Sequence, residues 1–157
     1  MAKKDNLIIG VDIGSYAVKV CQLLKTSQGY KLSAIGSSLI PPGAVEDGVL
    51  QNPEEVAKTI SELFKNLKIK SRKIGISISG YSVIVKKVSL EKMDDDSLAE
   101  YIKNEAEQYI PFDIDDVYID FQKLPQRKEN PDRLDVMLVA AKKEIVDDYI
   151  KMLKEIA

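Results

Sequence analysis

The stretch GVDIGSYAVKV, residues 10–20, places an acid and a base where both can act on one ligand. Asp12 interrupts an apolar run, a Gly-Ser turn signal follows it, and Lys19 lies in the next apolar run. Because strand side chains alternate between two faces, a hairpin centred on Ser15 and Tyr16 pairs Asp12 with Lys19. The sequence therefore predicts a carboxylate and an ammonium group side by side on one face of a hairpin.

That arrangement suits a phosphate that carries a divalent cation. The same register sets Gly10 against Cys21, so a glycine leaves open space beside the charged pair. Turn amides and the lysine would contact phosphate oxygens, and the aspartate would hold the metal directly or through water. The predicted phosphate-binding residues are Asp12, Gly14, Ser15, Tyr16 and Lys19, with Asp12 also the metal contact through water.

A structural interpretation of the same pair stands beside the functional one. An Asp/Lys pair across two strands is a common device that stabilises a hairpin by ~0.2–1 kcal/mol. The glycine patterns of the Walker A loop and of the Rossmann fingerprint are both absent from the sequence. Spacing alone leaves both interpretations open.

Composition excludes several other kinds of site. The 157 residues contain no histidine, so Ser-His-Asp and Cys-His catalysis and histidine-ligated metals are excluded. The single cysteine, Cys21, lies in an apolar strand pattern and is expected to be a buried thiol in a reducing compartment. A net charge of -2 gives no reason to expect nucleic acid as a partner, and no apolar run is long enough to span a bilayer. The expected location is the cytoplasm.

The elements that position these residues form an α/β pattern with a change at Gly80. Asn52, Pro53 and Glu55 give the signature of a helix N-terminus, and the two-proline segment 40–52 before it reads as a loop. In the first half we expect strands at 7–13, 17–24, 30–39 and 74–79. In the second half we expect a βαββα unit with strands at 83–90, 117–124 and 134–141 and helices at 94–109 and from 143 to the end.

The hairpin stretch resembles the first phosphate-binding motif of the actin, Hsp70 and sugar-kinase superfamily. Three further stretches give a narrower resemblance, to the PilM family. Its members are actin-like cytoplasmic proteins of type IV pilus assembly, related to the cell-division protein FtsA. The three stretches are LIPPGAVEDGVLQNPEEVA at 39–57, ISGYSVIVKKVSL at 78–90 and NEAEQYIPFDIDDVYIDFQ at 104–122. The resemblance covers essentially the whole chain, and the combination of these stretches is far more specific than the phosphate motif alone.

The resemblance implies an actin-like ATPase (ribonuclease H-like) fold. Residues 1–80 would be the first half of subdomain 1A, and residues 81–157 would be the FtsA-type subdomain 1C with its βαββα order. It also implies ATP with Mg²⁺ as the ligand of the whole protein. The second phosphate motif and the adenosine motif would lie in a C-terminal half, so we expect a truncated chain with an incomplete ATP site and no nucleotide bound.

As to function, the resemblance implies a nucleotide-binding component of the type IV pilus assembly platform, recruited to the inner face of the inner membrane without insertion. Its partners would be the N-terminal cytoplasmic tail of PilN and other pilus assembly proteins. Two alternatives stay open, an FtsA-like cell-division adaptor and a small-molecule kinase or ATPase of the same superfamily. No catalytic residue is identified, so whether the protein is an enzyme is left open. The candidate groove for the partner tail comprises Gly80, Tyr81, Tyr109, Ile110, Pro111 and Phe112. A structural interpretation stays open for the last four, which would then close the core of the second half.

Overall fold

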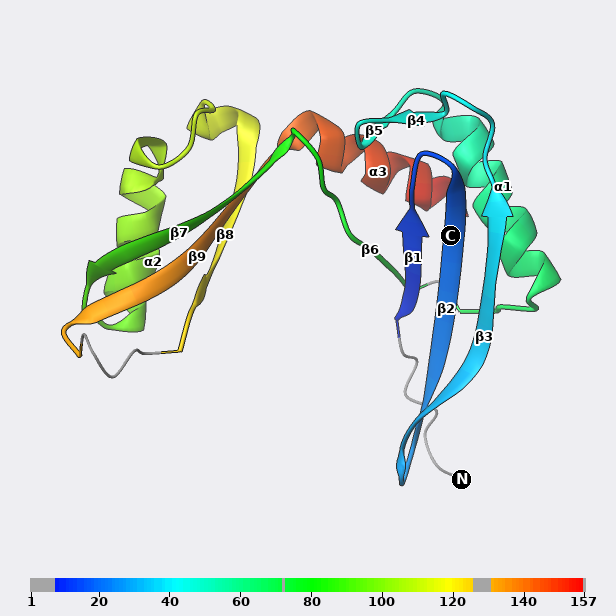
Figure 1. Ribbon diagram of the computed structural model, residues 1–157, viewed down its shortest axis with the longest axis horizontal. Coiled ribbons are helices and arrows are strands. Elements are labelled where there is room, and N and C mark those ends of the chain that lie inside the picture. Colours follow the sequence, from blue (N-terminus) through cyan, green and yellow to red (C-terminus); the bar gives the residue numbers. More distant parts are fainter. Residues whose placement is uncertain (1–7, 72, 126–130, 157) are drawn as a thin grey trace. The chain divides into compact units, whose positions relative to one another are not determined.

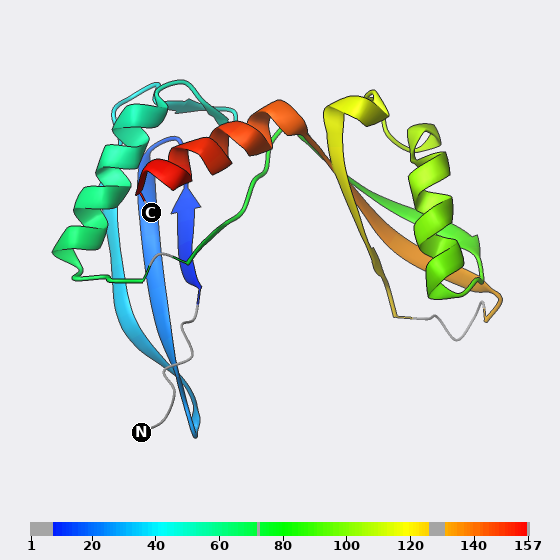
Figure 2. The same cartoon turned by 180° about the vertical axis from the view of Figure 1, so that it is seen from behind.

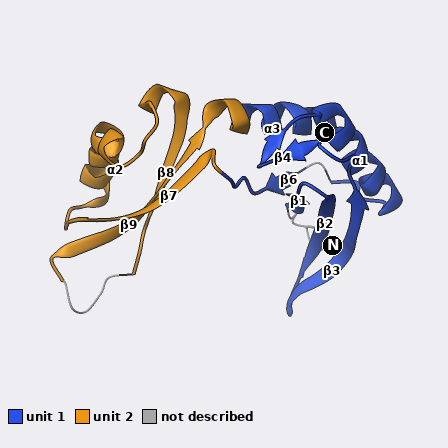
Figure 3. Ribbon diagram, turned by 45° about the horizontal axis from the view of Figure 1, so that its top comes forward, with its two compact units in different colours: residues 1–80, 147–157 blue, residues 81–146 orange. Residues whose placement is uncertain are grey.

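The structure, a computed structural model, describes residues 8–71, 73–125 and 131–156. The chain divides into two compact units (Figure 3). Unit 1 contains residues 1–80 and 147–157, and unit 2 contains residues 81–146. The assignment of 1–80 and 81–157 to subdomains 1A and 1C stays a prediction.

Unit 1 is built on a four-stranded sheet with the order β3-β2-β1-β6. β1 pairs antiparallel with β2 and parallel with β6, and β2 pairs antiparallel with β3. The expected strands are present, although β6 is shorter than the predicted 74–79 and residue 7 lies outside the described residues. The bounds are β1 Ile9–Ile13, β2 Ala17–Thr26, β3 Gly29–Leu39 and β6 Ile74–Ile76.

One face of this sheet carries the core of unit 1. Helices α1, Pro53–Asn66, and α3, Lys143–Ile156, lie on the same side of the sheet (Figures 1 and 2). Burying apolar side chains between these layers supplies the main stabilising free energy of the unit. The side chains buried there include Ile9, Val11, Val18 and Val20 of the sheet, Val56, Ile60 and Phe64 of α1, and Met152 of α3.

Helix α1 begins where its sequence signature predicts. The Asn52 side chain accepts a hydrogen bond from the Glu55 N–H at 3.3 Å, and Pro53 occupies the first turn. This cap satisfies one of the N–H groups that an α-helix leaves unpaired at its start. The helix then holds its apolar face against β2 and β3, which fixes the strands that form the hairpin.

The sequence predicts a loop over 40–52, but the segment is not simply a loop. It contains a small hairpin of β4, Val45–Glu46, and β5, Val49–Leu50. Asp47 and Gly48 form its tip with φ of 50° and 79°. A two-residue turn with positive φ at both positions matches the right-handed twist of a hairpin, and Asp-Gly is a preferred sequence for it.

Unit 2 is a three-stranded antiparallel sheet with the order β7-β9-β8 and helix α2 on one face. Asp94 caps α2 by accepting a hydrogen bond from the Ser97 N–H at 2.8 Å. The predicted helix 94–109 is therefore shorter, and its last turn is the 3₁₀ segment η1. The bounds are β7 Val83–Glu91, α2 Asp95–Glu105, η1 Ala106–Gln108, η2 Ile114–Asp116, β8 Val117–Lys123 and β9 Arg133–Lys142.

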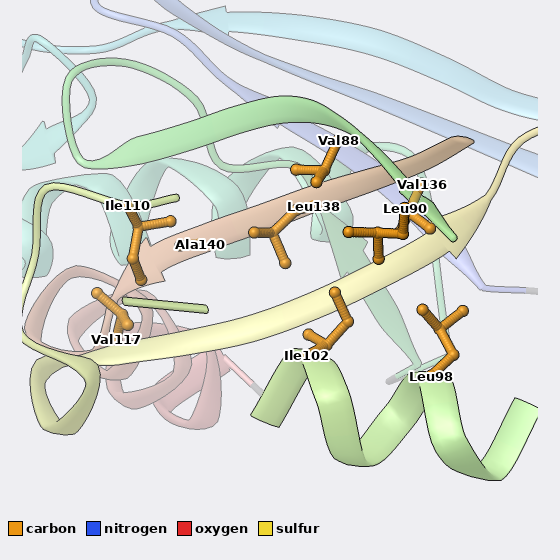
Figure 4. Close-up of a cluster of buried hydrophobic side chains, with 9 residues drawn as sticks. All are labelled: Val88, Leu90, Leu98, Ile102, Ile110, Val117, Val136, Leu138 and Ala140. Carbon is orange, nitrogen blue, oxygen red and sulfur yellow. The ribbon is translucent and has the colours of Figure 1, made fainter. Parts of the chain in front are cut away.

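The core of unit 2 lies between α2 and the sheet (Figure 4). Leu98 and Ile102 project from α2 toward the residues of the sheet, among which Leu138 is fully buried. The other buried members of this core are Val88, Leu90, Ile110, Val117, Val136 and Ala140.

No helix in the described part of the chain is long and apolar enough to cross a membrane.

Candidate functional site

The hairpin of β1 and β2 has the register that the sequence predicts. Asp12 is opposite Lys19, and Gly10 is opposite Cys21. The Lys19 Nζ lies 2.8 Å from the Asp12 Oδ2, and the two side chains keep 65% and 59% of their surface exposed. The predicted carboxylate and ammonium group therefore form an ion pair that is open to solvent.

The turn that connects β1 and β2 lies at the same end of the hairpin as the ion pair of Asp12 and Lys19. Gly14 donates its N–H to the Ala17 carbonyl at 3.1 Å, which closes the turn, while Ser15 and Tyr16 are exposed at its tip. The Tyr16 carbonyl accepts a hydrogen bond from the Ile40 N–H at 3.1 Å. This bond ties the tip to the end of β3, so the tip backbone is held in place while the Tyr16 side chain stays 73% exposed.

A shallow depression of about 370 Å³ lies on the open face of the sheet beside the ion pair. Two glycines, Gly10 and Gly75, are paired across β1 and β6 and remove side chains from its floor. Cys21, predicted to be buried, is only partly buried because this face has no helix over it in the part that the structure describes. The residues around the floor include Asp12, Lys19, Cys21 and Ile35.

The chemistry of the hairpin fits the phosphate end of a nucleotide and little more. Asp12 is one carboxylate, and no cluster of three or more potential metal ligands occurs among the described residues. A single carboxylate suits a Mg²⁺ ion that keeps most of its water and takes its other ligands from phosphate oxygens. The Lys19 ammonium has three N–H donors and gives one of them to Asp12, so it can also contact a phosphate oxygen.

A second depression, of about 660 Å³, borders the hairpin tip and was not predicted from the sequence. It lies between Ser15 and Tyr16 on one side and the β4-β5 hairpin on the other, where Glu46 and Asp47 line it. The Asp-Gly pair at 47–48 was the sequence signal for this hairpin, because that dipeptide favours a tight turn. Two further carboxylates thus lie near the predicted phosphate-binding turn.

The six candidate residues of the partner groove occupy different environments. Gly80 ends unit 1 with φ of 105°, and Tyr81, which is 86% exposed, begins unit 2. Ile110 is buried in the core of unit 2, and Tyr109 packs against that core with its hydroxyl 3.0 Å from the Tyr101 hydroxyl. The remaining two differ as well, since Pro111 is exposed and Phe112 is partly buried under the Lys142 ammonium at 5.4 Å from its ring centre.

Comparison with protein families gives one match that covers nearly the whole chain. The family described as type IV pilus assembly protein PilM matches residues 10–157. The match includes the hairpin of Asp12 and Lys19 and all of unit 2.

Two solved structures share the fold. One, described as a PilM-PilN type IV pilus biogenesis complex, matches with a TM-score of 0.80 and 29% identity over 94% of this chain and 44% of that chain. The other is the cytoplasmic domain of EpsL, an inner-membrane component of the type II secretion system of Vibrio cholerae. It matches with a TM-score of 0.55 and 14% identity over 95% of this chain and 52% of that chain, and it indicates the fold alone. The chain spans about half the length of these structures, and the predicted fold class is confirmed.

Proposed function

Because this chain belongs to the family of the type IV pilus assembly protein PilM, we propose that it binds the N-terminal cytoplasmic tail of a PilN protein. The observation that supports the proposal is the likeness to a chain of a PilM-PilN complex, which extends over 94% of this chain. Further contacts with other pilus assembly proteins at the inner face of the inner membrane belong to the same proposal.

A flexible tail of this kind should bind with modest strength. Ordering an extended segment removes much of the free energy that its contacts supply, so a micromolar dissociation constant is expected. An extended peptide gains affinity from backbone hydrogen bonds and specificity from side chains that fill small pockets. Apolar residues of the tail should therefore matter more than its charges.

The experiment is fluorescence anisotropy with a labelled PilN N-terminal peptide and the 157-residue chain. The control is the same peptide with its apolar residues changed to Asp. Saturable binding of the first peptide and none of the second supports the proposal. Absence of binding by a chain that circular dichroism shows to be folded contradicts it.

The proposal includes a second part, a nucleotide that meets the β1-β2 hairpin. The exposed pair of Asp12 and Lys19 beside a glycine floor supports it, since these groups fit the phosphates and their Mg²⁺. The ion would neutralise phosphate charge while Lys19 contacts a phosphate oxygen. Because the described residues offer only this one wall, the rest of a nucleotide would remain in water.

A further inference from the structure

The two outer strands of unit 2 differ in how their outer edges are protected. β7 and β8 flank β9, so each has one edge that pairs with β9 and an outer edge that pairs with no strand among the described residues. An unpaired edge presents rows of N–H and C=O groups to which another strand can bond. Which residues present these groups follows from the register.

In β7 the odd-numbered residues point their backbone groups outward. Lys142 donates its N–H to the Ser82 carbonyl at 3.0 Å, and Lys92 donates its N–H to the Asp132 carbonyl at 3.1 Å. These bonds lie just beyond the two ends of the β7-β9 register, and bonded pairs alternate along an antiparallel ladder. The outward N–H and C=O groups therefore belong to Val83, Val85, Lys87, Ser89 and Glu91.

Part of this edge is already occupied by a side chain of the same unit. The Arg133 guanidinium donates to the Ser89 carbonyl, so the end of β7 near Glu91 is capped. Val83, Val85 and Lys87 have no such cap among the described residues. The open part of the edge thus runs over the first half of β7.

β8 provides the contrast within the same sheet. Leu124 donates its N–H to the Asp135 carbonyl at 2.8 Å, so the odd-numbered residues of β8 point outward. Among these, Phe121 donates its N–H to the Asp120 carboxylate at 2.8 Å. The middle of the β8 edge is therefore closed by its own side chain, whereas the middle of β7 is open.

The side chains along the open edge define what it would accept. Val85 is 61% exposed and lies beside Val139 of β9 on the face without a helix. Lys86 is exposed on the opposite face, and Lys87 is held at 2.7 Å by Asp135. An added strand would therefore set apolar side chains beside Val85 and acidic ones beside Lys86.

We propose that the outer edge of β7, from Val83 to Lys87, binds an extended peptide that alternates apolar and acidic residues. The peptide would add a fourth strand to the sheet of unit 2 through the outward backbone groups of Val83, Val85 and Lys87. Charge complementarity selects this occupant over a second copy of the chain. Antiparallel self-pairing about Val85 would set Lys86 against Ile84 of the second copy, with no acid opposite either lysine. This inference goes beyond the proposed function and does not depend on it.

The test uses the 157-residue chain and acetylated peptides of about nine residues, the length of β7. One peptide alternates valine with glutamate, and its match alternates valine with lysine. Isothermal titration should give at least about tenfold tighter binding of the glutamate peptide. Equal binding of both peptides, or of neither, overturns the proposal.

Two variants locate the site. Val85→Pro removes an outward N–H without breaking the β7-β9 ladder, so the chain should fold and bind the glutamate peptide at least about tenfold more weakly. Lys123→Pro removes an outward N–H from β8 and should leave binding unchanged. Lys86→Glu should reverse the preference toward the lysine peptide, which gives a gain of binding that misfolding cannot imitate.

Each remaining result contradicts the proposal. Unchanged binding by folded Val85→Pro, or an unchanged preference in Lys86→Glu, places the peptide elsewhere. Sedimentation that shows self-association of the chain, lost in Val85→Pro, assigns the edge to a second copy instead.

Discussion

The Asp12 carboxylate and the Lys19 ammonium group lie 2.8 Å apart on neighbouring strands, yet both side chains are more than half exposed. Solvent screens an ion pair in this position, and fixing two long side chains offsets part of the attraction. The pair therefore contributes little to folding. A ligand could replace one member of the pair as the partner of the other without a large loss of stability.

Replacing either member of the pair should change stability only slightly. We expect Asp12→Asn and Lys19→Gln each to lower the free energy of unfolding by less than ~1 kcal/mol, the usual range for exposed pairs. Urea denaturation followed by circular dichroism measures it. A matched exposed pair is Lys58 with Glu55 on α1, and Lys58→Gln should behave alike. A loss of several kcal/mol in Lys19→Gln alone would make the pair a structural element.

The 157-residue chain should bind Mg-ATP weakly or not at all. The hairpin meets only the phosphates, and a ligand that leaves most of its surface in water gains little free energy. Titration calorimetry with Mg-ATP tests this directly, with the Asp12→Asn variant as the control for binding elsewhere. A micromolar dissociation constant that the variant weakens would contradict the expectation of an incomplete site and would show that one hairpin suffices.

The hairpin register was predictable because local rules determine it. A short turn between two apolar runs leaves one pairing that keeps Val11 and Val20 on the buried face, and that pairing brings Asp12 to Lys19. The start of α1 was predictable for the same kind of reason, since Asn52 and Pro53 act on the turn that follows them.

Features that depend on distant residues were not predictable from the sequence. Cys21 is only partly buried because the sheet has helices on one face, and a strand pattern does not reveal which faces are covered. Ile110, a candidate for the partner groove, lies after the helical segment in the core of unit 2, and the local sequence does not distinguish these two positions. The contact of Tyr149 with Gly48 joins residues more than 100 positions apart, and no local pattern encodes it.

Substitution of Gly48 or Gly80 should destabilise the protein, because Gly48 lies close to Ser79 and Gly80 lies close to Asp47. A Cβ at Gly48 would lie 2.4 Å from the Ser79 carbonyl oxygen, and one at Gly80 would lie 2.7 Å from the Asp47 carbonyl oxygen. Both have positive φ as well. Gly29 is a matched control, since its φ is also positive but a Cβ there would meet nothing within 4 Å.

We expect Gly29→Ala to cost about 1–2 kcal/mol of unfolding free energy from the backbone alone. Gly48→Ala should cost at least ~1 kcal/mol more, because the carbonyl must move as well. Urea denaturation of the three proteins separates the two effects. Equal losses at both positions would indicate that the Ser79 backbone moves freely.

Leu138 should be among the most sensitive positions of unit 2. Its side chain is fully buried at the centre of the sheet, between α2 and the neighbouring strands. Leu138→Ala should cost about 2–5 kcal/mol, as in other cores where a cavity replaces a leucine. Leu39→Ala, at a residue 62% exposed, is the control and should change the melting temperature little. A small loss at Leu138 would mean that the core of unit 2 repacks readily.

Tyr149 should make stability fall at alkaline pH. Tyr149 is 4% exposed and its hydroxyl donates to the Gly48 carbonyl at 3.1 Å, while desolvation raises its pKa above the ordinary tyrosine value of 10.0. A tyrosine whose pKa is higher in the folded state stabilises the fold fully below pH 10.0 and loses that contribution as pH rises through the folded value. In the unfolded chain the phenol ionises first, which favours unfolding.

Tyr149→Phe removes this titration and also the hydrogen bond. At neutral pH the loss of the hydrogen bond should lower the free energy of unfolding by about 0.5–1.5 kcal/mol. The loss is larger if the Gly48 carbonyl, left without this donor, finds no other. Between pH 9 and 11 its unfolding free energy should decline less steeply than that of the wild type, measured by urea denaturation at each pH. Tyr30→Phe, at a side chain 68% exposed, is the control and should keep the wild-type slope. Parallel slopes for wild type and Tyr149→Phe would show that the Tyr149 hydroxyl ionises as easily in the folded protein as in the unfolded chain.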